Sequence, residues 1–341
     1  MTTAPLRLRL DAAALVANWR LLARLSGTAA CGAAVKANGY GLGARGVVQR
    51  LAAAGCRDFF VASWAEARDL ADLGVTVSVL HGLRAEDLAD RPPHVRPVLG
   101  TPEQVQRWRE AGGGACDVMV DTGMNRLGVS PAQVAAGLLD GLAIETLMSH
   151  LVSADEEVDL NARQLHAFAA LAGHSSARRL SLANSSGLAL GADYHFDLTR
   201  PGIALYGGRQ RAPHAGIAQV VTPEAQILQR RRVTAGETIG YNATYTAPRD
   251  MEVAILNLGY ADGYLRCFSN KGRALAGDAV LPVVGRVSMD LTAICVDAAP
   301  TLAEGDWVSM AYDLPETAAL SGLSQYELIT GLGARFDRVW A

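Results

Sequence analysis

Short apolar runs alternate with amphipathic stretches of helical period over the first two thirds of the chain. The runs follow one another at roughly 20 to 30 residues, which is the spacing of repeated strand-helix units. Eight such runs are present, at residues 31–35, 59–62, 77–80, 96–99, 117–120, 144–148, 180–182 and 196–198. The helical stretches between them span residues 12–23, 44–54, 65–73, 102–110, 131–139 and 158–171.

Two of these stretches carry a clear start signal for a helix. Thr101 precedes Pro102 and Ser130 precedes Pro131, so a capping hydroxyl stands before a proline at the first helical position. Eight parallel strands with helices between them are the count of a (β/α)8 TIM-type barrel, whose active site lies at the carboxyl ends of the strands. An open, doubly wound sheet is the rival arrangement.

After about Ala218 the pattern of apolar and turn-forming residues changes, and closely spaced β-like segments follow one another. The turn glycines Gly236, Gly272, Gly277 and Gly305 separate segments of the length found in small β barrels. A closing helix is predicted at residues 324–332. We therefore predict an α/β barrel domain over residues 8–218. The second predicted domain is mainly β and consists of residues 219–341 together with residues 1–7.

Composition and charge narrow the function. The 341 residues are 50% apolar and 19% charged, which provides a core and argues against disorder. A net charge of -3 without long runs of one sign favours a small-molecule ligand over nucleic acid or a membrane surface. The five cysteines are scattered singly, so we expect no metal site. The first residues resemble no secretory signal and no apolar run has membrane-spanning length, which favours a cytoplasmic location.

Lys36 is the first candidate for chemistry. It follows the apolar run CGAAV and precedes ANGYGLG, so it would emerge from the end of the first barrel strand into a glycine-rich loop. A lysine in a loop is usually solvated. In a partly desolvated pocket, however, a lysine can lose its proton and form a Schiff base with an aldehyde cofactor.

Other polar residues recur just past strand ends. Arg126, His150, Ser185 and Arg200 occupy this position, and the amides that follow Arg200 could hold a phosphate as late barrel loops do. Each residue has an ordinary interpretation by itself: a solvated arginine, a hydrogen-bonded core histidine or a helix-capping serine. Their joint placement indicates a common polar face.

Seven strings of the chain resemble, in order, the motifs of the alanine racemases, a pyridoxal-phosphate-dependent family. The strings are VKANGYGLG, DTGMNRLG, LANSSG, RPGIALYG, IGYNATYTA, LGYADGY and VGRVSMD. The resemblance runs from Leu6 almost to the end of the chain. It implies an isomerase that interconverts L-alanine and D-alanine, in a homodimer arranged head to tail.

The resemblance also implies how pyridoxal phosphate is held. Lys36 resembles the lysine that carries the cofactor and acts as the base on the D face of the substrate. Tyr40, Ser185, Gly202 and Ile203 correspond to the family's phosphate contacts.

Two further residues correspond to contacts with the pyridine ring. His150 resembles the residue that lies against the ring, and Arg200 the arginine that hydrogen-bonds the ring nitrogen. Because a guanidinium gives up its proton reluctantly, the ring nitrogen would stay unprotonated and the cofactor would be a poorer electron sink than in most such enzymes.

The substrate contacts implied by the resemblance come from both domains. Tyr241 resembles the base for the L face, contributed by the partner subunit, so the active sites would be shared. Arg126 resembles the arginine that contacts the substrate carboxylate, and Met289 the residue whose backbone amide holds that carboxylate. Tyr260 and Arg266 fall where the family has surrounding and entrance groups. Inversion needs two bases on opposite faces of the α-carbon, and a lysine and a tyrosine of depressed pKa can serve.

Three positions depart from the family pattern. Met119 stands where many members have a carboxylated lysine that orients the substrate arginine, and Ala334 stands where many have a phosphate-binding tyrosine. The usual histidine of YGHG is Leu42. The smaller residue at Ala334 suggests tolerance of serine or another slightly larger amino acid.

Other interpretations remain open. A broad-specificity racemase or an amino acid decarboxylase of the same fold is the nearest alternative, although such decarboxylases lack the motif around Tyr241. A non-catalytic pyridoxal-phosphate-binding regulator is a third, but regulators of that kind end after the barrel.

Overall fold

The computed structural model describes residues 4–341, so residues 1–3 of the expected N-terminal β segment lie outside the described part. Backbone contacts divide the chain into two compact units. The first is Ala13–Ala218, and the second is Gln219–Ala341 together with the described residues up to Ala12.

The first unit is built on parallel strands. They are β2 (Ala30–Cys31), β3 (Ala33–Ala34), β4 (Asp58–Val61), β5 (Thr76–Val79), β6 (Val95–Leu99), β7 (Ala115–Met119), β8 (Ala143–Met148), β9 (Arg179–Ser181) and β10 (Leu198–Thr199). Strands β3 to β9 form a seven-stranded sheet in chain order, and β10 pairs in parallel with β2.

The sheet closes on itself. The amides of Asp197 and Arg200 donate to the carbonyls of Leu180 and Ala183, at 3.0 and 2.8 Å, and so join β10 to β9. Strands β2 and β3 are one strand interrupted at Gly32, where a Cβ atom would lie 2.9 Å from the carbonyl oxygen of Asp58. Eight strands of the described chain therefore form a barrel, which confirms the predicted fold and excludes the open sheet.

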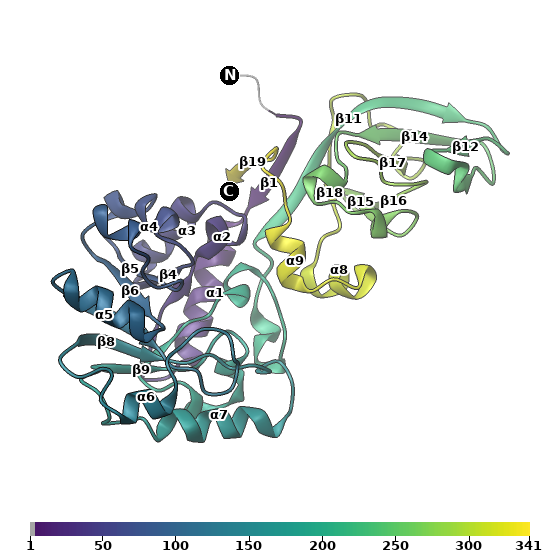
Figure 1. Cartoon of the computed structure of the whole chain (residues 1–341). Helices are drawn as coiled ribbons and strands as arrows, with labels where there is room; N and C mark the ends of the chain where they lie inside the picture. The colour runs from purple at the N-terminus through teal and green to yellow at the C-terminus, as the bar shows by residue number, and fades with distance from the viewer. Residues whose placement is uncertain (1–3) are drawn as a thin grey trace. The chain divides into compact units, whose positions relative to one another are not determined.

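Helices lie outside the strands (Figure 1). They are α1 (Ala12–Leu25), α2 (Lys36–Tyr40), α3 (Ala44–Ala54), α4 (Trp64–Arg68), α5 (Pro102–Glu110), α6 (Pro131–Ala135) and α7 (Asp159–Ala169). The hydroxyls of Thr101 and Ser130 accept from backbone amides three residues on, so both predicted caps are confirmed.

Two predicted helices are shorter than expected. The stretch at residues 65–73 divides into α4 and a separate 3-10 turn, and the stretch at 131–139 ends as a helix at Ala135. Their apolar residues are buried all the same, since Leu70 and Leu139 are 0% and 2% exposed. The apolar pattern therefore reports burial more reliably than it reports helix length.

The core of the barrel unit comes from apolar strand and helix residues. Phe59 and Phe60 on β4 and Val47, Val48 and Leu51 on α3 are all about 1% exposed or less. Burying each such side chain stabilises the fold by roughly 1.5 to 3 kcal/mol. This packing fixes the strand ends in space and so provides a rigid base for the loops that follow them.

The second unit is mainly β. Its strands are β1 (Leu6–Leu10), β11 (Val221–Val233), β12 (Thr238–Ile239), β13 (Tyr245–Thr246), β14 (Met251–Leu256), β15 (Arg273–Ala276), β16 (Ala279–Pro282), β17 (Thr292–Cys295), β18 (Trp307–Met310) and β19 (Asp337–Trp340). Strand β11 pairs with β1, β18 and β14, and β12 and β13 form a separate hairpin. Helix α9 (Gln325–Thr330) lies within the predicted closing helix, whereas α8 (Leu314–Ser321) was not predicted.

Short 3-10 turns connect these elements. They are η1 (Ala71–Leu73), η2 (Glu86–Ala89), η3 (Gly187–Leu190), η4 (Ala192–Tyr194), η5 (Ile203–Tyr206), η6 (Ala212–Gly216), η7 (Tyr241–Ala243), η8 (Tyr260–Asp262) and η9 (Arg266–Phe268). Among the described helices, none has the length and apolar character needed to cross a membrane.

Candidate active site

Lys36 begins an unusual turn at the end of β3. The next four residues, from Ala37 to Tyr40, have φ values of 53°, 53°, 64° and 54°, so the chain makes a left-handed turn that only glycine adopts without strain. The turn is held by the Asn38 side chain, which accepts from the amide of Ala44 at 2.9 Å, and by Glu66, which accepts from the amide of Ala37 at 2.7 Å. Strain of this kind is found where a functional group must be placed in one position.

Four basic side chains gather around this turn. Burial lowers the pKa of Lys36, and the positive charges of Arg126 and Arg200 lower it further, while Glu66 acts in the opposite direction. Burial and the charges of Arg200, Arg126 and Lys36 lower the pKa of His150 to about 3, so this imidazole is neutral at physiological pH. The structure therefore brings together the four basic residues that the sequence placed after separate strands.

Arg200 is the most deeply buried member of this group. It is 6% exposed, and its guanidinium donates to the hydroxyl of Ser181 and to the backbone carbonyl of Ser149. Burial lowers its pKa to about 10, which still leaves it charged at neutral pH. The negative charge of Asp117 partly offsets this lowering of the pKa, but the two hydrogen-bond acceptors of the guanidinium are neutral. A buried cation of this kind favours an anionic or electron-rich ligand beside it.

The loop that carries Arg126 is fixed by Asp121. The carboxylate of Asp121 accepts from the amides of Gly123 and Met124 at 2.8 Å and from the amide of Arg126 at 3.0 Å. Burial alone would raise the pKa of Asp121, but these backbone hydrogen bonds outweigh it and lower the pKa. The side chain of Arg126 is exposed, so its backbone is ordered while its guanidinium stays accessible.

A cradle of hydroxyl and amide groups lies beside the basic cluster. The hydroxyl of Ser185 accepts from the amides of Gly202, at 2.9 Å, and Ala204, at 3.3 Å. A Cβ atom at Gly202 would lie 2.2 Å from the hydroxyl of Tyr40, so that hydroxyl lies directly over the glycine. Ile203 is the first residue of η5 and directly follows Gly202. Tyr40, Ser185 and Gly202 therefore lie together, with Ile203 next along the chain, in the grouping that the family resemblance implied.

The opposite end of the barrel differs in its electrostatics. Asp58 and Arg179, at the starts of β4 and β9, form an ion pair of 2.7 Å, and the buried Asp117 pairs with Arg96 at 3.3 Å. None of the four basic groups at the other end forms an ion pair with a carboxylate of the described chain. That end therefore has an excess of positive charge, as an anion-binding site requires.

Two predicted site residues belong to the β unit. Tyr241 opens η7 and is 65% exposed, and Met289 is 54% exposed in the loop before β17. The carbonyl of Met289 accepts from the amide of Ala261 at 3.0 Å, which anchors this loop against η8. Both residues are thus presented at the surface of the second unit.

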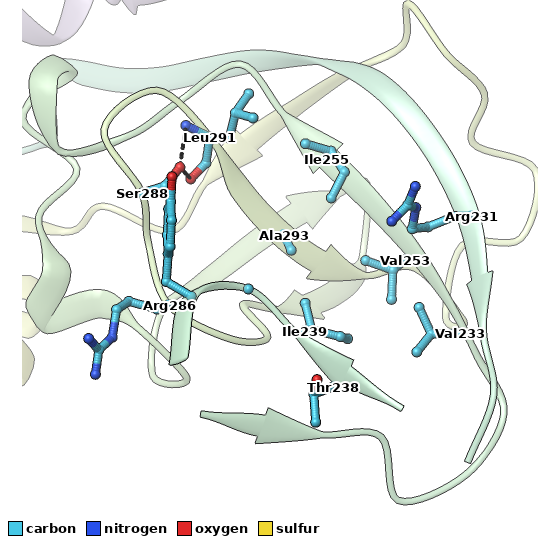
Figure 2. Close-up of a pocket in the computed structure, with 12 residues that line it drawn as sticks. Arg231, Val233, Thr238, Ile239, Val253, Ile255, Arg286, Ser288, Leu291 and Ala293 are labelled. Atoms are coloured by element: carbon cyan, nitrogen blue, oxygen red, sulfur yellow. Dashed lines mark hydrogen bonds between the residues drawn. The ribbon is translucent and has the colours of Figure 1, made fainter. Parts of the chain in front are cut away.

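Tyr241 also lines a pocket of about 390 Å³ in this unit. The floor is apolar and includes Val233, Val253 and Ala293, while Arg231 and Arg286 add positive charge (Figure 2). Ser288 and Leu291 close one side by hydrogen bonds between the Ser288 hydroxyl and the Leu291 backbone.

The three positions that depart from the family pattern have distinct environments. Leu42 is fully buried, which accounts for an apolar residue there, and Met119 is 8% exposed at the end of β7. Ala334 is exposed. Glu66, Ser149 and Ser181 could not be selected from the sequence, because their importance lies in contacts with residues distant in the chain.

The fold and this polar end define a (β/α)8-barrel protein with a basic ligand-binding end and a separate β domain. Residues 10–210 match the family described as alanine racemase, N-terminal domain, and residues 220–340 match the alanine racemase C-terminal domain. The chain belongs to the alanine racemase family, which confirms the resemblance of its motifs.

Individual relatives agree with this assignment. The chain is 42% identical to an alanine racemase of Acidiphilium cryptum over 97% of its length and 98% of the relative's. It is 44% identical to one from a Jannaschia species over 97% of each chain. A crystal structure of alanine racemase from Bartonella henselae with covalently bound pyridoxal phosphate is 33% identical, with a TM-score of 0.88 over 100% of both chains. The biosynthetic alanine racemase from Pseudomonas aeruginosa, 31% identical over 100% of both chains, gives the same TM-score of 0.88.

Proposed function

We propose that this chain is a pyridoxal-phosphate-dependent alanine racemase that interconverts L-alanine and D-alanine with two bases. Lys36 serves the D face, and Tyr241 of the partner subunit serves the L face. The observation that carries the proposal is the gathering of Lys36, Arg126, His150 and Arg200 beside a hydroxyl and amide cradle, with no carboxylate paired to any of them among the described residues.

The residues present fit pyridoxal phosphate. The hydroxyl groups of Ser185 and Tyr40 lie together with the backbone of Gly202 and Ile203, and the Gly202 amide donates to the Ser185 hydroxyl. These groups would hold the phosphate of the cofactor. Lys36 offers the amine for the aldehyde. The bound cofactor supplies an electron sink that makes the substrate's α-proton removable.

Residues of the chain would transfer the α-proton of the substrate and hold its carboxylate in place. Lys36 has a lowered pKa, so a larger fraction of its amine is free to accept a proton at neutral pH than for a solvated lysine. A base on the opposite face must return a proton to invert the centre, and we assign that role to the Tyr241 hydroxyl. Arg126 would hold the substrate carboxylate together with the Met289 amide.

His150 and Arg200 would act on the ring. His150 is neutral and can lie against the ring without adding charge. Arg200 keeps its proton at neutral pH, so it would donate to the ring nitrogen and that nitrogen would stay unprotonated. We propose that this weakens the electron sink and limits side reactions.

The arrangement of subunits belongs to the same proposal. Tyr241 is exposed on the β unit, as a side chain that serves a second copy must be before assembly. We therefore infer a head-to-tail homodimer with shared sites, located in the cytoplasm. Its product would serve peptidoglycan synthesis, or the enzyme would act in alanine catabolism.

The test is racemisation of L-alanine followed by chiral chromatography, with added pyridoxal phosphate. Wild-type protein should produce D-alanine, Lys36→Ala should abolish conversion, and Tyr241→Phe should slow it strongly. The absence of conversion by cofactor-loaded wild-type protein would overturn the proposal and favour a binding role.

Broader specificity is the second candidate. The exposed Ala334 stands where many family members have a tyrosine, and the smaller side chain leaves more space. Comparing the turnover of L-alanine and L-serine distinguishes a racemase specific for alanine from one that also accepts serine. If the protein does not convert L-serine, the broader specificity is excluded.

A further inference from the structure

Helix α7 buries amide side chains where an amphipathic helix normally buries apolar ones. The buried residues of α7 are Asn161, Gln164 and Phe168, whereas every buried residue of α3 is apolar. Burying an amide costs free energy unless its polar atoms find partners. The polar face of α7 must therefore be matched by specific polar groups on the barrel.

Gln164 finds such partners on two different loops. Its Oε1 accepts from the amide of Val152 at 2.9 Å, and its Nε2 donates to the carbonyl of His150 at 3.0 Å and to the hydroxyl of Thr122 at 3.3 Å. Thr122 lies in the loop after β7, which carries Arg126, and the other two partners lie in the loop after β8. One side chain of 0% exposure thus ties two loops together.

The hydrogen bonds continue from Thr122 to Arg200. The hydroxyls of Thr122 and Ser149 are 2.7 Å apart, and a Thr122 hydroxyl that accepts from Gln164 has its own proton available for Ser149. The carbonyl of Ser149 in turn accepts from the guanidinium of Arg200. The chain of contacts therefore reaches from a helix on the outside of the barrel to the buried cation at its end.

We propose that Gln164 is a positioning residue that holds Arg126, His150 and Arg200 in one fixed arrangement for racemisation. The inference rests on the proposed function and deepens it, since Gln164 itself would touch neither substrate nor cofactor. Fixing the two loops would favour catalysis, because even a small displacement of a group that positions the substrate lowers the rate of reaction by a large factor.

Gln164→Leu is the principal variant, because leucine has a similar volume but no hydrogen-bonding group. We expect the KM for L-alanine to rise about tenfold through the loosened Arg126 loop. The absorption spectrum of the bound cofactor should change, because the loop of His150 is also released. In cofactor-free protein, amide hydrogen exchange at Val152 should become faster.

Gln104 offers a matched control. Its Oε1 accepts from the amide of Gly100 at 2.8 Å and its Nε2 donates to the carbonyl of His81 at 3.5 Å, so it joins the loops after β5 and β6 in the same manner. Those loops carry no proposed site residue. Gln104→Leu should speed exchange at Gly100 but leave KM and the cofactor spectrum within about twofold of wild type.

A folded Gln164→Leu protein with wild-type KM and cofactor spectrum would overturn the proposal. If Gln164→Leu does not fold, Thr122→Val decides, because it removes only the hydroxyl that receives Nε2; an unchanged KM in that variant also overturns it. If wild-type protein racemises nothing, the proposed function fails separately. The cofactor spectrum and the exchange at Val152 then decide: changes in both support the positioning role, and faster exchange with an unchanged spectrum contradicts it.

Discussion

Arg200 and Ser181 form a hydrogen bond in the interior of the barrel that leaves the arginine's charge uncancelled. The guanidinium donates to the Ser181 hydroxyl, which itself donates to the carbonyl of Leu198. Ser181 ends β9 and Leu198 begins β10, so the contact is built on two neighbouring strands. Because the acceptor is neutral, Arg200 exerts its positive charge on His150 and Lys36.

Ser181→Ala should therefore lower both stability and activity. The variant leaves a buried N–H of Arg200 without its acceptor, which costs about 1 to 3 kcal/mol of the free energy of unfolding. It also frees the guanidinium to rotate, so kcat/KM for L-alanine should fall. Urea denaturation and racemisation assays measure the two effects.

Ser26→Ala is the control for that experiment. Ser26 is 2% exposed and its hydroxyl bonds to the Leu22 carbonyl and to the hydroxyl of Thr199, the residue before Arg200. Consecutive side chains of an extended segment point to opposite sides, so this contact does not involve the guanidinium. This variant should lose comparable stability and retain kcat/KM. If both variants lose kcat/KM equally, Ser181 has only a structural role.

The residues that follow the strand ends could be predicted from the sequence, whereas the residues that hold them by hydrogen bonds could not. Lys36, His150 and Arg200 were identifiable because each follows a strand, and closure of a parallel barrel brings strand ends together. Gln164 and Ser181 were not identifiable, since an amide on a helix and a hydroxyl on a strand have no periodic signature. Their partners lie 12 to 42 and 17 to 19 residues away, and only the folded chain brings them into contact.

The same reasoning explains the errors in helix length. Residues 131–139 have an apolar pattern that continues past Ala135, yet the helix ends there. Leu139 is buried from a turn instead of from a helix. A pattern of apolar residues specifies what must be buried, and turns can bury a side chain as effectively as helices can.

His150 should make the cofactor-free protein sensitive to acid. The pKa of His150 in the folded chain, about 3, lies below its ordinary value of 6.5, so between these two pH values the unfolded chain binds a proton that the folded chain does not. This contribution to stability is complete above pH 6.5 and is lost progressively as the pH falls from 6.5 towards 3. His150→Gln should therefore lose less stability than wild type between pH 7 and about 5.

The measurement is the urea midpoint of cofactor-free protein at the two pH values. His174→Gln, at an exposed position, is the control and should behave as wild type. An equal loss of stability in wild type and His150→Gln would contradict a half-buried His150 whose pKa is lowered by the neighbouring cations.

Lys36 should be modified selectively by the cofactor. The chain contains two lysines, Lys36 and Lys271, against 29 arginines, so the alternatives are few. Burial, Arg126 and Arg200 lower the pKa of Lys36, which increases its free amine at neutral pH. Borohydride reduction of the cofactor-loaded protein should place the pyridoxyl mass on the Lys36 peptide. Equal labelling of the exposed Lys271 would contradict this expectation.

Gly202→Ala should weaken cofactor binding, because the added methyl group meets the Tyr40 side chain. Gly202 has a φ of -127° and a ψ of -88°, so it does not use the left-handed conformation that favours glycine, and the effect to be tested is contact with Tyr40. The new Cβ would lie 2.2 Å from the Tyr40 hydroxyl and 2.9 Å from its Cζ. The ring of Tyr40 stacks on that of Tyr206 with centroids 4.7 Å apart, and both residues are buried, so it has little freedom to yield.

Over-packing of this kind costs about 1 to 3 kcal/mol, which corresponds to a loss of affinity of roughly fivefold to 150-fold if the strain falls on the cradle. Fluorescence titration of cofactor-free protein with pyridoxal phosphate measures the loss. Gly100→Ala is the control, since its Cβ would meet no atom closer than 3.4 Å. In a Tyr40→Phe background the hydroxyl is absent, so Gly202→Ala should have a smaller further effect. Unchanged affinity in Gly202→Ala would mean that Tyr40 and Gly202 do not form the phosphate cradle, and the cofactor phosphate would then have to bind elsewhere at the barrel end.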